Sequence, residues 1–276
     1  MNRHQDKHTT LPFPTARRFL VDTCELGSQK HLIHGLLEID VTDTRRRLRQ
    51  CRDKDRETPS FTGFVINCVA RAVDENKIMH AYRGSRDRLI LFDDVDVTTI
   101  VEVEAGGHKV PLGHIIRAAN KRTLWQIHDE IRSVQSAGGS KADSSLAGWR
   151  QRLMLSLPAF LRRAFYRAGI KRPQGMKKRA GTVLVTAVGM FGQGTGWGIP
   201  LSLHTLTVTL GGIVERPGVV AGEIKIREYL SVTVSFDHDI IDGAPAARFA
   251  QRLQTLVESG YGLDEEEMLD EEVSNA

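Results

Sequence analysis

The stretch SFDHDIIDGAPAARF, residues 235–249, decides the fold prediction because it joins a strand to a helix through one short turn. The segment before the turn, YLSVTVSF (229–236), alternates apolar and hydroxyl side chains, as a strand with one buried face does. His238 follows just past the end of that strand. The segment after the turn, at about 244–258, repeats apolar residues at helical spacing, and Gly260 follows as a stop. The sequence therefore predicts a strand that delivers a histidine into a strand-to-helix turn.

The residues of this turn predict a rigid setting for His238. We expect Asp242 to cap the helix, Gly243 to take an unusual backbone φ and Pro245 to lie early in the helix. Catalytic side chains are often positioned at such element boundaries. Histidine is the side chain best matched to moving a proton near neutral pH. His238 is therefore a candidate general base, and the alternative is a buried or capping histidine on an inactive scaffold.

Length and composition limit the classes of protein to consider. The 276 residues are 41% hydrophobic and 26% charged, which is ordinary for a soluble globular chain with a sizeable core. No apolar run is long enough to span a bilayer, and the polar N-terminus lacks the apolar core of a signal peptide. The three cysteines fit neither a disulfide framework nor a metal-binding pair, and the histidines show no paired ligand spacing. We expect a cytoplasmic protein with reduced thiols, no transmembrane segment and no metal site.

The mixture of predicted helices and strands, without an internal repeat, favours an α+β fold. The segment ERPGVVAGEIKI predicts a hairpin that turns at Ala221 and Gly222. Residues 1–14 read as a flexible N-terminal arm, and residues 263–276 read as an acidic, disordered tail.

The net charge of +4 is unevenly distributed along the chain. No acidic residue occurs between Asp143 and Glu215, whereas residues 149–179 hold ten Arg or Lys and the C-terminal DEEEMLDEE holds seven acids. The rest of the chain is nearly neutral, so the basic balance is local and is not typical of a nucleic-acid-binding protein. Residues 156–168 predict a short basic helix with one apolar side. The basic residues on its other side are Arg162, Arg163 and Arg167.

The segment SVTVSFDHDIIDGAPAARF (231–249) resembles the catalytic signature of the acyltransferase components of 2-oxo acid dehydrogenase complexes. Chloramphenicol acetyltransferases share its His-x-x-x-Asp-Gly core. Four further segments resemble parts of the acyltransferase components in the same order: HGLLEIDVT (34–42), KVPLGHIIRAANKRTLWQIHDEI (109–131), TVLVTAVGMFG (182–192) and LGGIVERP (210–217). The resemblance covers about 15–134 and 180–262, which is most of the chain.

This resemblance implies a fold, an assembly and a set of roles. The implied fold is the chloramphenicol acetyltransferase-like α+β domain over residues 15–262, assembled as a homotrimer with active sites between subunits. His238 would deprotonate the thiol of coenzyme A or dihydrolipoamide, which then attacks the thioester. Thr186 stands where the family has a serine that donates to the oxyanion, and a Thr hydroxyl can do the same. Asp242 and Gly243 match the family's Asp-Gly, and the base and the oxyanion donor would come from different chains.

Three departures from the family pattern bear on the function. Asp239 replaces the arginine that follows the histidine, and we expect its charge to raise the pKa of His238. A basic insertion at about 135–179 is longer than the family's usual link. The chain carries no lipoyl domain and no subunit-binding domain, so we expect a stand-alone relative with no lipoyl group of its own. Coenzyme A or acyl-CoA is then the expected substrate, and a lipoylated protein in trans or a larger assembly remains an alternative.

The basic helix at 156–168 is expected to dock its apolar side onto the body of the protein, and the alternatives are a lid near the phosphates of coenzyme A or a contact with a membrane surface.

The leading function is acyl transfer between thioester and thiol. The competing function is a non-catalytic trimeric scaffold or acyl-CoA-binding relative, which the charge of Asp239 and the absence of further domains favour.

Overall fold

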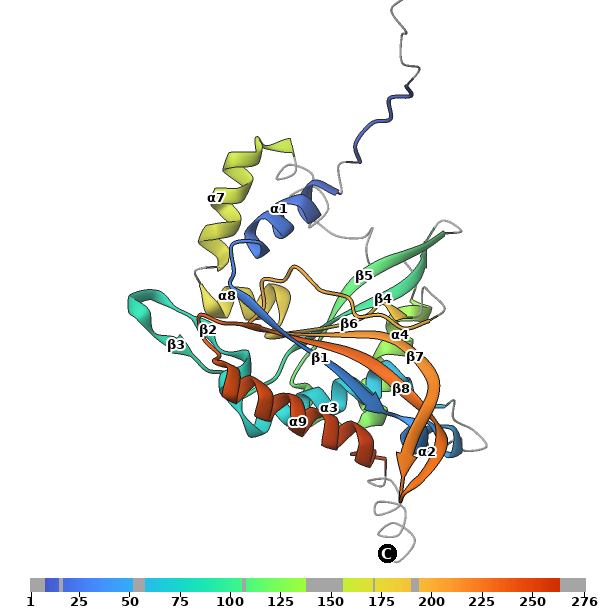
Figure 1. Cartoon of the computed structure of the whole chain (residues 1–276). Coiled ribbons are helices and arrows are strands. Elements are labelled where there is room, and N and C mark those ends of the chain that lie inside the picture. The colour runs from blue at the N-terminus through green and yellow to red at the C-terminus, as the bar shows by residue number, and fades with distance from the viewer. Residues whose placement is uncertain are drawn as a thin grey trace, which may run out of the picture.

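The structure is a computed structural model, and it describes residues 8–14, 17–51, 58–105, 108–137, 156–170, 172–189 and 194–263. A six-stranded mixed sheet in the order β1-β8-β7-β6-β4-β5 forms its centre (Figure 1). The strands are β1 (Leu32–Asp40), β4 (Val97–Ala105), β5 (His108–Ile116), β6 (Val183–Ala187), β7 (Leu206–Val220) and β8 (Glu223–Asp237). β6 runs parallel to both of its neighbours, and the other pairs are antiparallel. The mixed sheet confirms the predicted α+β class.

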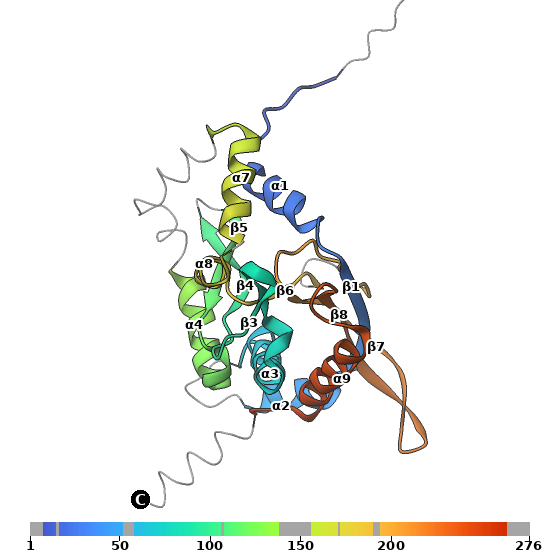
Figure 2. The same ribbon diagram turned by 90° about the vertical axis from the view of Figure 1, so that its left-hand side faces the viewer.

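Three long helices cover one face of this sheet (Figures 1 and 2). They are α3 (Phe61–Glu75), α4 (Leu124–Ser136) and α9 (Gly243–Ser259). Their ends are set locally: the Ser60 hydroxyl caps α3, Thr123 and Gln126 form a capping box on α4, and Gly260 ends α9 in the left-handed conformation. Gly260 therefore stops the last helix, as predicted.

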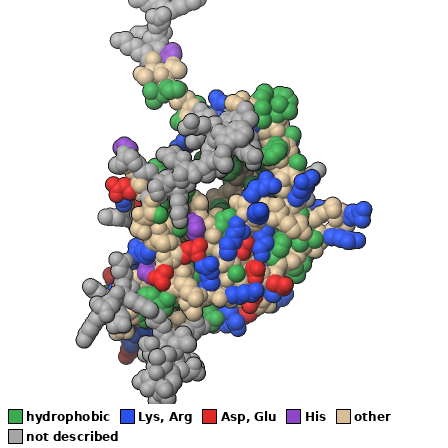
Figure 3. Space-filling view, turned by 180° about the vertical axis from the view of Figure 1, so that it is seen from behind, with side chains coloured by type: hydrophobic (Ala, Val, Ile, Leu, Met, Phe, Trp, Pro, Cys, Tyr) green, Lys and Arg blue, Asp and Glu red, His purple; other side chains and the backbone are tan. Residues whose placement is uncertain are grey.

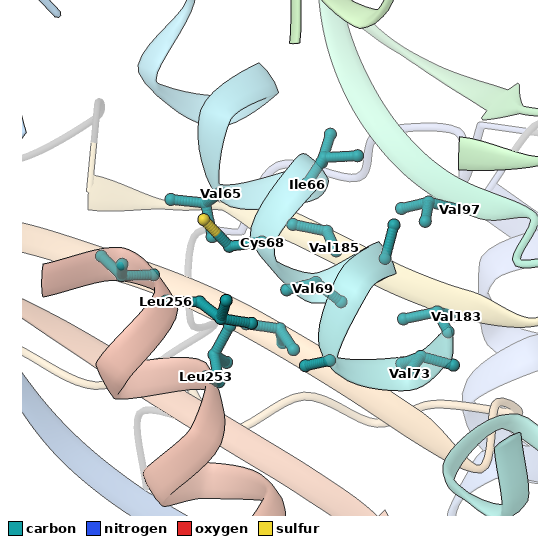
Figure 4. Packing of buried hydrophobic residues seen from close by; sticks show 14 of the residues in the cluster. Val65, Ile66, Cys68, Val69, Val73, Val97, Val183, Val185, Leu253 and Leu256 are labelled. Carbon is teal, nitrogen blue, oxygen red and sulfur yellow. The ribbon is translucent and has the colours of Figure 1, made fainter. Parts of the chain in front are cut away.

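The core lies between these helices and the sheet. Figure 4 shows apolar side chains of α3 packed between those of α9 and those of β4 and β6, and all of them are buried. Residues of this cluster include Val65, Val69, Val73, Val97, Val183, Val185, Leu253 and Leu256. β8 adds Leu230, Val232, Val234 and Phe236 to the same core, as the predicted alternation requires. The prediction that only one face of this strand is buried is wrong, because Ser231, Thr233 and Ser235 are buried on the other face.

Shorter elements complete the fold. α2 (Thr42–Gln50) follows β1, the strands β2 (Tyr82–Arg83) and β3 (Leu89–Ile90) pair with each other, and three 3₁₀ helices connect longer elements: η1 (Lys77–His80), η2 (Ser85–Asp87) and η3 (Ala119–Lys121). The β7–β8 hairpin extends past the sheet (Figure 1) and turns at Ala221 and Gly222, as predicted. Both residues have positive φ, at 52° and 82°, as a two-residue hairpin turn requires.

Helices α1 (Arg17–Gly27), α7 (Ala159–Ile170) and α8 (Pro173–Ala180) lie at the other side of the sheet, with α1 and α7 side by side (Figures 1 and 2). The prediction that α7 docks its apolar side is wrong. Arg162 is buried, and its Nε lies 2.7 Å from Oδ2 of the fully buried Asp22 in α1, while Phe160 is 70% exposed. A buried carboxylate requires a paired cation, and this demand outweighs the apolar pattern of the helix.

The sequence predictions for residues 1–7, for most of the basic insertion (138–155) and for the acidic tail (264–276) lie outside the described residues. Within the described part of the chain, no helix combines the length and the hydrophobicity that crossing a membrane requires.

Candidate active site

The ring of His238 lies just beyond the end of β8, where the sequence predicts it. Its backbone N–H donates to the carbonyl of His31 at 2.7 Å. Its side chain is 46% exposed, and Nδ1 lies 3.9 Å from Oδ1 of Asp242. That separation is longer than a hydrogen bond, so the carboxylate attracts the ring without fixing its orientation. The turn thus presents an imidazole that a solvent-borne group can reach.

Contacts of Asp237 fix the turn that carries His238. The nearly buried carboxylate of Asp237 pairs through Oδ2 with Nζ of Lys30, and its Oδ1 accepts from the N–H of Asp239 at 3.2 Å. Its carbonyl accepts from two later N–H groups of the turn, at 3.0 and 2.9 Å. These bonds constrain the backbone on both sides of His238. Sequence reasoning missed Lys30, because nothing marks a single lysine far upstream as a partner of this aspartate.

The side-chain cap predicted for Asp242 and the unusual backbone φ predicted for Gly243 are both wrong. Asp242 occupies the N-cap position of α9, but its side chain makes no capping hydrogen bond and is exposed on the side of His238. Gly243 begins α9 and is absent from the residues with positive φ, so the expected unusual backbone angle is wrong. A Cβ on Gly243 would meet no heavy atom within 4 Å. The bonds of Asp237 close the turn instead.

The sequence predicts that the charge of Asp239 acts on the ring of His238, but the carboxylate is hydrogen-bonded to another histidine. Its Oδ1 accepts a hydrogen bond from Nδ1 of His31 at 2.9 Å, on the exposed surface beside the turn. This hydrogen bond lowers the pKa of Asp239 and raises the pKa of His31. The charge that replaces the family's arginine is therefore paired with a second histidine.

Thr186 lies on β6 with its side chain on the sheet face opposite the core helices. Val183 and Val185 point into the core, so Leu184 and Thr186 point to the other face. In the sheet register Thr186 pairs with Thr209 of β7, and Thr209 pairs with Thr233 of β8. The hydroxyls of Thr209 and Thr233 are buried without a hydrogen-bond partner among the described residues. Sequence reasoning did not single them out, although alternating Thr and Ser in LTVTL and SVTVS could have indicated a hydroxyl-bearing face.

His238 and Thr186 are far apart within one chain. His238 lies five residues beyond Thr233, the position level with Thr186, and two strands away from β6. With about 3.3 Å per residue along a strand and about 4.8 Å between strands, the separation is on the order of 20 Å. One chain therefore does not bring these two side chains to the same thioester carbonyl.

The described residues contain no group of three or more His, Cys, Asp or Glu side chains able to hold a metal ion. The chemical groups gathered near His238 are thus an exposed imidazole, nearby carboxylates and the ammonium of Lys30. They suit proton transfer.

Comparison with known proteins points to one family. Residues 163–263 match the family model described as 2-oxoacid dehydrogenases acyltransferase (catalytic domain). The chain is 32% identical over 224 residues to the lipoamide acyltransferase component of the branched-chain alpha-keto acid dehydrogenase complex of Pseudomonas putida. This chain is a relative of the 2-oxoacid dehydrogenase acyltransferase catalytic domain. It is also 25% identical over 225 residues to the component of the same name from Pseudomonas aeruginosa. Each alignment covers 80% of this chain and 45% of the relative.

Solved structures of such proteins share the fold. A probable dihydrolipoamide acetyltransferase from Listeria monocytogenes superposes with a TM-score of 0.70 at 19% identity, covering 92% of this chain and 95% of that one. The cubic core of the pyruvate dehydrogenase multienzyme complex superposes with a TM-score of 0.67 at 15% identity, covering 94% and 95%. The chain spans about half the length of the curated relatives it matches.

Proposed function

We propose that this protein transfers an acyl group between a thioester and a thiol, with coenzyme A or dihydrolipoamide as the thiol. The observation that carries the proposal is the exposed imidazole of His238, held at the end of β8 by the contacts of Asp237, in a chain related to acyltransferase catalytic domains. Residues 15–262 form the catalytic unit of this proposal.

In the proposed reaction, a ring nitrogen of His238 takes the proton of the attacking thiol. The thiolate adds to the thioester carbonyl carbon, and the hydroxyl of Thr186 donates a hydrogen bond to the resulting oxyanion. Collapse of the tetrahedral intermediate breaks the original carbon–sulfur bond. The departing thiolate then receives the proton from His238. Asp242, whose carboxylate lies 3.9 Å from Nδ1 of the ring, helps to hold the site in this proposal, as the matching aspartate of the family does.

The active site of this proposal lies between subunits of a homotrimer. The separation of His238 and Thr186, on the order of 20 Å by strand geometry, requires that they come from different chains. Exposed apolar side chains support an assembly, because monomers rarely leave such patches open to water. They lie on the hairpin arm at Val219, Ile224 and Ile226, and on α1 and α7 at Leu20, Phe160 and Phe165.

Coenzyme A esters are the first substrates to test, and a lipoylated protein in trans is the second. The purified chain is given a panel of acyl-CoAs with dihydrolipoamide as acceptor. Removal of a positioned general base costs on the order of 10²- to 10⁴-fold, so His238→Ala should lose activity to that extent. Thr186→Val keeps the shape and removes the hydroxyl, and it should lose about 10²- to 10³-fold, whereas Thr186→Ser should stay active.

Two results would contradict the proposal. Undiminished turnover in His238→Ala removes this histidine as the base. Tight binding of acyl-CoA by the wild-type chain, without turnover of any thioester in the panel, instead supports the non-catalytic scaffold.

A further inference from the structure

A cavity of about 480 Å³ lies on the same side of the sheet as Thr186. Its floor is formed by Thr98 and Ile100 of β4, Gly113 and Ile115 of β5 and Leu184 of β6. Its walls come from α1, α7 and α8, which lie over this end of the sheet (Figure 2). The space-filling view from behind shows a hollow in the upper half of the molecule with hydrophobic side chains beside it (Figure 3). The volume lies in the range of small-molecule sites, about 300–1,000 Å³.

The sheet register places the cavity next to Thr186. β4 and β6 are parallel and pair residue by residue from Val97 with Val183 to Thr99 with Val185. This pairing ends at Thr99 and Val185. Leu184 lines the cavity and points to the same face of the sheet as Thr186, two residues away along β6 at about 6.6 Å. Thr186 therefore lies one side-chain position beyond the cavity floor on its own strand.

The lining of the cavity is suited to an apolar occupant. Apolar side chains of the three helices face it, including Phe19, Leu26, Ile170 and Met176. The polar groups of the lining are mostly paired with the protein itself. The Thr98 hydroxyl donates to the Ala180 carbonyl at 2.5 Å, and His204 Nε2 binds the same carbonyl.

The charges of the lining also suit an apolar occupant. Burial lowers the pKa of His204 to about 4, so the ring is neutral near pH 7. Arg179 is the charged residue among the described lining residues, and it is exposed, with its guanidinium beside Gly169 and Gly175 where α7 meets α8. Such a wall offers few free donors for the amides of a pantetheine arm, whereas a hydrocarbon chain needs none.

We infer that this cavity holds the acyl group of the thioester, so that the protein prefers medium-chain apolar acyl groups to acetyl or succinyl groups. This inference rests on the proposed function, since it needs Thr186 at the thioester carbonyl. A carbonyl oxygen held by Thr186 on β6 lets the acyl chain run past Leu184 and across the cavity floor over Ile100 and Gly113, which pair with each other. Helix α7, part of the basic insertion, then covers the acyl site, and the buried ion pair of Arg162 with Asp22 holds α7 against α1.

Gly113 offers a direct way to fill the cavity. A Cβ at this position would meet no heavy atom within 4 Å, and the residue lies in a strand without positive φ. Gly113→Leu therefore begins its side chain in open space and extends it into the cavity, and glycine itself weakens the interior of a strand. Val110→Leu is the matched control, because Val110 is exposed on the opposite face of the same strand.

The experiment compares acetyl-, butyryl-, hexanoyl-, octanoyl- and decanoyl-CoA with dihydrolipoamide as acceptor. Each methylene buried in the cavity should raise kcat/KM about fourfold until the cavity is full. In Gly113→Leu, kcat/KM for octanoyl- and decanoyl-CoA should fall at least about tenfold, because the leucine occupies the space of several methylenes. The fall for acetyl-CoA should be several-fold smaller than the fall for decanoyl-CoA, and Val110→Leu should behave as wild type with every thioester.

A binding measurement separates this inference from the proposed function. Calorimetry with the non-reactive ethyl and decyl thioethers of coenzyme A should show tighter binding of the decyl compound, and Gly113→Leu should abolish the difference. Acetyl-CoA turnover with a flat chain-length profile, or a profile unchanged in Gly113→Leu, overturns the inference and leaves the proposed function intact. No turnover of any thioester, together with selective decyl binding lost in Gly113→Leu, overturns the proposed function and retains the cavity as an apolar-chain site.

Discussion

Lys30 is predicted to hold the turn that carries His238 through its ion pair with Asp237. The two side chains are 19% and 6% exposed, so Lys30→Met leaves a nearly buried carboxylate without its cation. Breaking a buried pair costs about 3–5 kcal/mol, and the remaining bond from the Asp239 N–H to Oδ1 favours the lower end, about 3 kcal/mol. The turn backbone then loosens around His238, and a misplacement of about 1 Å can cost on the order of 10²-fold in rate.

Urea unfolding followed by circular dichroism measures the stability change, and acyl-CoA turnover measures the change in kcat. Lys30→Arg keeps the cation and should recover most of both quantities. Lys225→Met removes a pair with Glu223 that is exposed on the hairpin arm, and it should change the unfolding free energy by less than about 0.5 kcal/mol. An equally small change in Lys30→Met, with kcat intact, would refute the positioning role of Lys30.

Three further outcomes follow from the same structure. Burial lowers the pKa of His80 and of His204 to about 4, so the unfolded chain binds protons before the folded chain does as the pH falls below 6.5. The unfolding free energy should therefore be about 2 kcal/mol per histidine lower at pH 5 than at pH 7.5. Equal unfolding free energies at the two pH values would contradict this prediction. Leu253→Ala leaves a cavity between α9 and α3 and should cost about 2–5 kcal/mol in the same assay while kcat changes little; a loss below about 1 kcal/mol would argue against the described core. Asp239→Asn removes the carboxylate that raises the pKa of His31, so the NMR titration midpoint of His31 should move down, and an unchanged midpoint would mean that the pair does not form in solution.

Much of the fold was predictable because local patterns agree with the tertiary structure. The alternation in 229–236 matches a strand whose apolar side chains face the core, although its hydroxyl face is buried as well. The hairpin turn at 221–222 takes the positive φ angles that its two-residue length demands. Ser60, Thr123 and Gly260 set helix ends through contacts made within a few residues. These features need no information from distant parts of the chain.

The failures all involve partners that are distant in sequence. The orientation of α7 is set by the pair of Arg162 with Asp22, 140 residues away, which no helical pattern reports. The turn at His238 is held by Lys30, 207 residues away, rather than by the cap and glycine that its local sequence indicates. Asp239 likewise pairs with His31. Tertiary ion pairs therefore decide the details of the site, while the strand that carries His238 is a local feature.

In the proposed reaction, His238 of one chain and Thr186 of its neighbour act on the same thioester. The most direct test co-expresses two inactive variants, His238→Ala and Thr186→Val, and isolates the mixed oligomers. Each variant keeps the residue that the other lacks, so a random 1:1 trimer should regain roughly one intact site in four. Recovery of about that fraction of wild-type acyl transfer, with none when the variants are purified separately and mixed without exchange, is the predicted result. Mixed oligomers as inactive as either variant would contradict a site shared between chains.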